Sequence, residues 1–78
     1  MSKYQHYLFD LGLIVKERAL QARGEAEKAR GTDDHDFEDG RVLAFNEVIS
    51  IMQQQAEGFE IPLSELRLDD IVPDRDLT

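Results

Sequence analysis

The sequence predicts an all-α protein: an antiparallel two-helix hairpin, then a short C-terminal helical turn and a tail. Two long proline-free stretches rich in helix-forming residues carry apolar side chains at spacings of three, four and seven. A segment of glycine and aspartate, residues 31–36, separates them and is typical of a helix end followed by a helix start. We expect one helical domain over 1–78, because domains rarely fall below roughly 50 residues.

The first helix is predicted over about residues 3–30. Seven-residue spacing places two apolar rows side by side, and the second consists of small residues that let another backbone approach closely. The rows are Leu8, Val15, Ala22 and Ala29, joined by Tyr4 and Leu11, and then Gly12, Ala19 and Ala26. Close packing is the expected reason for a glycine at position 12, since an interior glycine weakens a helix.

The turn is predicted over residues 31–35 and the second helix over about 36–57. Asp34 or Asp36 is expected to cap this helix with its side chain. One apolar stripe, expected to face the first helix, follows helical spacing: Phe37, Ala44, Val48, Ile51, Met52 and Gln55. Arg41 can pair with Glu25 or Glu17 across the hairpin, but we expect its stem to cover the core while its head reaches water.

A short helix is predicted over about residues 62–67, because Pro62 suits the first helical position. The last stretch, 69–78, is expected to be an irregular tail. Its apolar residues, and those just before it, are too numerous for a free chain end. We expect them to fold back onto the first helix or onto a second subunit.

The first helix is apolar on more than one side, and a chain of 78 residues without cysteine has little else to cover it. We therefore expect self-association, most simply a homodimer that forms a four-helix bundle. The candidate interface residues are Tyr4, Tyr7, Phe9, Leu13 and Leu20. Tyr4 and Tyr7 fit an interface and a contact with the chain's own tail equally well.

The formal net charge is −8, which argues against binding to nucleic acid. Residues 1–30 carry six basic and four acidic side chains, whereas residues 31–78 carry three and thirteen. The alternative function is therefore an acidic regulator or inhibitor, of the immunity-protein, antitoxin or nucleic-acid-mimic kind, that binds a basic partner. Its candidate surface is Asp33, Asp34, Asp36 and Asp39.

No pattern in the sequence indicates catalysis or a cofactor, so the main hypothesis is a non-catalytic structural or interaction module. The acidic turn fails as an EF-hand, because its sixth and twelfth positions counted from Asp34 are Asp39 and Phe45. We expect no metal site there beyond weak binding. No stretch approaches the ~20 apolar residues that span a bilayer, and Asp10 interrupts the first apolar block. We therefore expect no membrane association and a cytoplasmic location.

Overall fold

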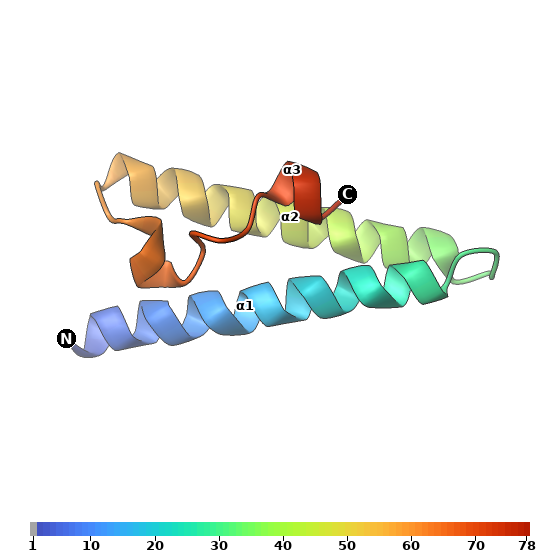
Figure 1. Cartoon of the computed structure of the whole chain (residues 1–78), viewed down its shortest axis with the longest axis horizontal. Coiled ribbons are helices and arrows are strands. Elements are labelled where there is room, and N and C mark those ends of the chain that lie inside the picture. The colour runs from blue at the N-terminus through green and yellow to red at the C-terminus, as the bar shows by residue number, and fades with distance from the viewer. Residues whose placement is uncertain (1) are drawn as a thin grey trace.

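A computed structural model describes residues 2–78 and shows two long helices packed antiparallel along a body 45 Å long (Figure 1). Helix α1 spans Lys3–Lys28 and helix α2 spans His35–Gly58. A 3-10 helix, η1, follows at Leu63–Leu66, and a short helix, α3, at Pro73–Asp76. The predicted all-helical hairpin is confirmed. Within the last ten residues, only Pro73–Asp76 are helical and the other six residues are irregular, as predicted for the tail.

Local hydrogen bonds explain where the helices begin and reverse. The hydroxyl of Ser2 accepts from the Gln5 amide at 3.2 Å, and the Gln5 side chain accepts from the Ser2 amide at 2.7 Å, which forms a capping box before α1. At the other end, Gly31 adopts a φ of 79°, which glycine tolerates without steric cost. The Thr32 hydroxyl donates to the Ala29 carbonyl at 2.6 Å, and this closes the turn.

The small-residue side of α1 is buried, as the sequence predicts. Ala19 and Ala22 are fully buried and Ala26 nearly so. Gly12 is also buried, and a Cβ there would overlap the backbone carbonyl of Leu66. The backbone that approaches Gly12 is therefore that of η1 and not that of α2, because η1 lies between the diverging ends of the two helices (Figure 1).

The predicted core face of α2 is wrong. The buried residues of α2 are Val42, Ile49 and Ala56, which recur every seven residues and do not belong to the expected stripe. Most residues of the expected stripe are exposed instead, among them the large side chains of Phe37, Val48 and Ile51. Helix α2 carries apolar residues on two faces, and Phe45 and Met52 lie partly buried beside the row that enters the core.

Residues 63–78, which we call the C-terminal segment, pack on the hairpin of the same chain and cover one side of it. The side-chain amide nitrogen of Asn46 donates to the backbone carbonyls of Pro73 and Leu77 at 3.0 and 3.2 Å. The side-chain amide nitrogen of Gln53 donates to the backbone carbonyls of Leu68 and Ile71 at 3.1 and 2.9 Å.

These side-chain amides satisfy backbone carbonyls that no regular secondary structure would pair. Leu68 and Leu77 are fully buried as a result. On α1, the ammonium of Lys16 donates to Asp70 at 2.9 Å, and the guanidinium of Arg67 lies 4.9 Å from the ring centre of Phe9. Both helices therefore contribute to holding the segment in place.

We predict opposite effects for two alanine substitutions in α1. Gly12→Ala places a methyl group against the Leu66 carbonyl and should destabilise the fold by about 1 to 3 kcal/mol. Gly24→Ala meets no atom within 4 Å, so the better helix propensity should stabilise the fold by about 0.5 to 1 kcal/mol. Urea unfolding followed by circular dichroism measures both. Equal midpoints for the two variants would mean that η1 does not lie against Gly12.

We also predict that Asp76 contributes to stability only above acidic pH. The Arg75 guanidinium and the Val72 amide, at 2.8 and 2.9 Å, lower the pKa of Asp76 from 3.8 to about 2. A carboxylate with a lowered pKa in the folded state stabilises the fold above its ordinary pKa, and this contribution disappears as the pH falls toward 2. Asp76→Asn should therefore be less stable than the parent at pH 6, and the two should converge near pH 2.

The measurement for Asp76 is the urea midpoint at intervals between pH 6 and pH 2. Asp69→Asn removes an acid that is exposed and serves as the matched control. Parallel curves for the parent and Asp76→Asn across that range would contradict the assignment.

Candidate functional site

The side of the hairpin away from the C-terminal segment is apolar and mostly uncovered, although Ile61 and Leu66 reach it between the two helices. Spacings of four and three put Tyr7, Leu11 and Ile14 on one side of α1, about half a turn from Gly12, which faces η1. On α2, Val48, Ile51 and Phe59 lie on a side that differs from the one on which Asn46 and Gln53 bind the C-terminal segment. We call this surface the open face and define it by Tyr4, Tyr7, Leu11, Ile14, Val48, Ile51 and Phe59.

A groove of about 300 Å³ lies within the open face, where α1 and α2 diverge. It runs between Leu8 and Leu11 of α1 and Ile51 and Phe59 of α2, and its floor includes Leu66. Its remaining lining residues are Met52, Gln55, Ala56 and Ile61. Gln55 supplies the only polar side chain among these nine residues, so the groove suits an apolar occupant and offers no group for acid–base or metal chemistry.

The exposed area is large for a chain of this size. Tyr4, Tyr7 and Phe59 are 72%, 65% and 73% exposed. At about 150 to 250 Å² per aromatic side chain, these three offer on the order of 400 Å². Ile14 and Ile51 are each about half exposed and extend the surface further. Monomeric proteins rarely leave more than a few hundred Å² of contiguous apolar surface in water, so the open face has the character of an interface.

A charged cluster occupies the half of the hairpin nearer the turn. One nitrogen of Arg41 donates to Glu25 of α1 at 2.6 Å and to Glu38 of α2 at 2.9 Å. These bonds raise the pKa of Arg41, and the Arg41 hydrogen bond is the main cause that lowers the pKa of Glu25. Of the two alternatives for Arg41, the structure shows the pairing with Glu25 across the hairpin, and 35% of the Arg41 side chain remains exposed to water. This pairing puts Glu25 and Arg41 at the same level of the hairpin.

The five residues predicted for self-association lie on two sides of α1. Tyr4 and Tyr7 belong to the open face. Both remain exposed, so neither is buried against the C-terminal tail of its own chain. Phe9 and Leu13 are half-buried on the other side, where Arg67 lies over the Phe9 ring, and Leu20 continues that side, half-exposed.

Sequence reasoning missed the α2 half of the open face, because it assigned those residues to the core. The signal was present: α2 carries a second apolar row, Val42, Ile49 and Ala56, at a spacing of seven. Two apolar rows on one helix of a two-helix protein leave one row without a partner inside the chain.

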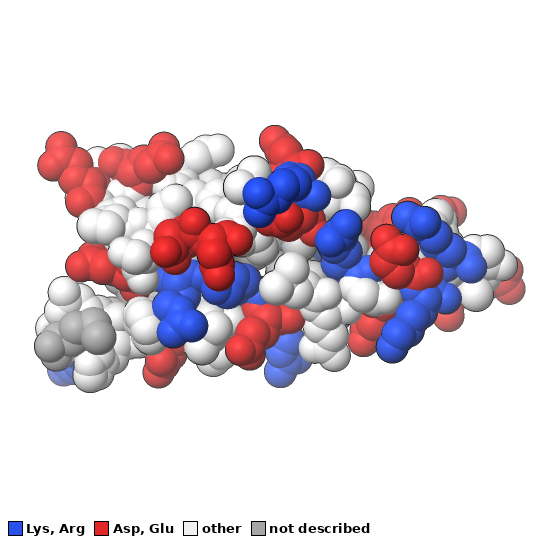
Figure 2. All heavy atoms as spheres, in the orientation of Figure 1, with Lys and Arg blue, Asp and Glu red and all other residues white. Residues whose placement is uncertain are grey.

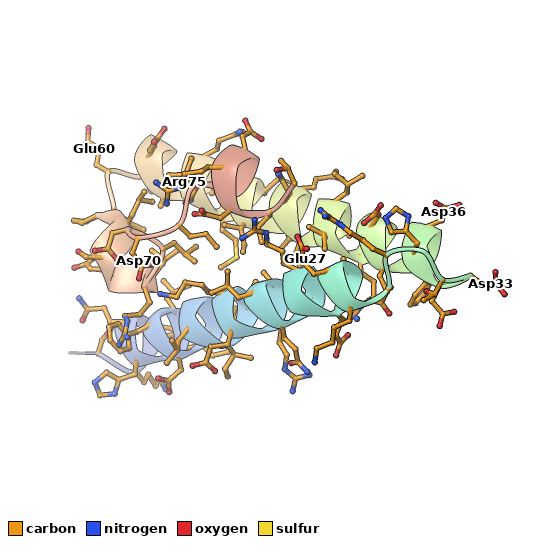
Figure 3. All side chains as sticks on the ribbon, turned by 45° about the vertical axis from the view of Figure 1, so that its right-hand side comes forward. Glu27, Asp33, Asp36, Glu60, Asp70 and Arg75 are labelled. Atoms are coloured by element: carbon orange, nitrogen blue, oxygen red, sulfur yellow. The ribbon has the colours of Figure 1, made fainter. Side chains whose placement is uncertain are left out.

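The acidic residues of the turn lie on the surface at one end of the molecule. Asp33 and Asp36 point outward there (Figure 3). Asp34 occupies the position before α2 but makes no capping hydrogen bond with its side chain, contrary to expectation. Asp39 lies 3.2 Å from a ring nitrogen of His35. Among residues 2–78, no lysine or arginine nitrogen forms a salt bridge with any of these four acids.

The remaining charges do not form a single field on the face that carries the C-terminal segment. Acidic and basic side chains alternate along it (Figure 2). Nowhere in residues 2–78 do three His, Asp or Glu side chains gather closely enough to hold a metal ion. Within the same residues, no helix has the length and apolar content needed to cross a membrane.

Comparison of the chain with protein-family models, with curated proteins and with solved structures found no match. The open face and its groove are therefore the features from which a function can be argued.

Proposed function

We propose that this protein is a small non-catalytic interaction module that pairs with a second copy of itself through the open face. The observation that carries the proposal is the unequal cover of the hairpin. The C-terminal segment buries Leu68 and Leu77 against one side, while Tyr4, Tyr7 and Phe59 on the other side remain mostly exposed.

A second copy is an occupant of the right size and chemistry. Stable interfaces bury about 800 Å² per partner, and the aromatic and aliphatic side chains of the open face together approach that area. The groove is apolar and the residues around it are apolar, so the surface complements itself, as a two-fold symmetric interface requires. Burial on pairing also adds stability to a hairpin of this length without disulfides.

We predict that Ile51→Glu converts a dimer into a folded monomer. Ile51 lines the groove and is 52% exposed, so the carboxylate remains solvated in the monomer but loses its hydration in the dimer. Size-exclusion chromatography with light scattering should show the mass falling from about 18 to about 9 kDa, since one chain weighs 9.0 kDa. Circular dichroism should show unchanged helix content at micromolar concentration.

The matched control is Leu43→Glu. Leu43 lies on the same helix, is 60% exposed and lines a different cavity, beside Thr78. It should leave the dimer intact. A parent protein that elutes as a 9 kDa monomer at 100 μM would overturn the proposal, and so would equal loss of the dimer in both variants.

The acidic turn favours a second candidate function, that of a regulator which binds a basic partner. Its four aspartates have no lysine or arginine partner among the described residues, so a basic protein would not need to break ion pairs to reach them. Charge contacts of this kind steer association and weaken with salt.

The test for this candidate compares the parent with a variant that changes Asp33, Asp34 and Asp36 to Asn, as baits for proteins of the native host. A basic protein retained by the parent at 50 mM salt, lost at 500 mM and not retained by the variant would support it. Retention that is the same for both baits would exclude the turn as the binding surface.

A further inference from the structure

We propose that the two copies pair in parallel, with both turns at the same end of the dimer and α2 of each copy lying over α1 of the other. This inference rests on the proposed self-association and adds the orientation of the partner. A two-fold axis along the length of the hairpin generates this arrangement, and it places each open face directly against the other.

Contacts within one copy show which residues of α1 and α2 lie at the same level. Arg41 contacts Glu25 in the half near the turn. Leu11 lines the same groove as Ile51 and Gln55 in the half away from it. Nearer the turn, the open side of the hairpin therefore carries the Arg41–Glu25 pair together with exposed Phe37, and we call this the charged half; the groove lies in the other, apolar half.

Parallel pairing brings like halves together. In the apolar half, Ile51 of one copy faces Ile14 of the partner subunit, and Phe59 faces Tyr7 of the partner subunit. All of these side chains are now exposed by about half or more. The groove of one copy meets the groove of the other, so the apolar surface is buried with Gln55 as the only polar side chain among its lining residues.

The charged half is also complementary in this orientation. Arg41 of each copy lies over Glu25 of the other, so the four groups form a ring in which the signs alternate. The guanidinium of Arg41 uses one nitrogen for both of its present bonds, which leaves its other donors for a second carboxylate. Pairing therefore adds ion pairs without breaking those already made.

Antiparallel pairing is less favourable for both halves. With the copies overlapping along their full length, the end that carries Tyr4 and Phe59 would lie against the acidic turn of the partner, near its Asp33 and Asp34. Aromatic surface would then face solvated carboxylates, and most of the groove would remain open. One cost of the parallel form is the proximity of the two acidic turns, and salt screens exposed charges of this kind. A second cost is that Glu38, which also binds Arg41, adds one carboxylate from each copy to the same region.

The test measures the distance between the two turns. The chain has no cysteine, so Asp33→Cys provides a single attachment point for a nitroxide spin label at an exposed site outside the open face. Double electron–electron resonance on the full-length labelled protein then reports the distance between copies. Glu57→Cys, exposed near the far end of α2, is labelled in the same way as a reference for the other end.

Parallel pairing predicts a distance between the Asp33→Cys labels closer to the 20 Å width of one copy than to its 45 Å length. A distance closer to 45 Å or longer, in a sample that light scattering shows to be a dimer, would overturn the orientation and leave the self-association intact. A monomer in light scattering, with no dipolar coupling in either labelled variant, would overturn both.

Discussion

The packing of the C-terminal segment against the hairpin determines which surfaces of the molecule are buried. Gly12 allows the backbone of η1 to lie directly against α1, and the side-chain amides of Asn46 and Gln53 bind four carbonyls of the segment on α2. These contacts all lie on one side of the hairpin. Because the sixteen residues 63–78, a segment of extended chain and short helices, can cover only one side, the opposite side keeps its apolar side chains in water.

The helices could be predicted from the sequence because their signals are local. Helix-forming residues, alanines that recur every seven residues and the glycine at position 31 favour or end a helix through contacts within one or two turns of the chain. The buried alanines of α1 were predicted correctly for the same reason, since Ala19, Ala22 and Ala26 fit only a closely packed side. The role of Gly12 was predicted too, although the approaching backbone belongs to a segment more than fifty residues away.

The buried face of α2 could not be predicted, because periodicity reports that a side is apolar and not what covers it. Phe37, Val48 and Ile51 form a stronger apolar stripe than Val42, Ile49 and Ala56. Asn46 and Gln53 donate to C-terminal carbonyls, and in the orientation of α2 that allows these bonds the weaker row meets α1. Val48 and Ile51 of the stronger stripe then become part of the α2 half of the open face, and Phe37 stays exposed nearer the turn. The α2 residues that were wrongly assigned to the core are thus the ones that the candidate interface uses.

The net charge of −8 gives the two proposed functions opposite dependences on salt. Two copies of an acidic chain repel each other at long range, so apolar contact has to supply most of the free energy of pairing, and added salt should strengthen it by screening that repulsion. Binding of a basic protein to the acidic turn depends on attraction between unlike charges, and the same salt should weaken it. The sign of the salt effect on an observed association therefore indicates which surface carries it, before any residue is changed.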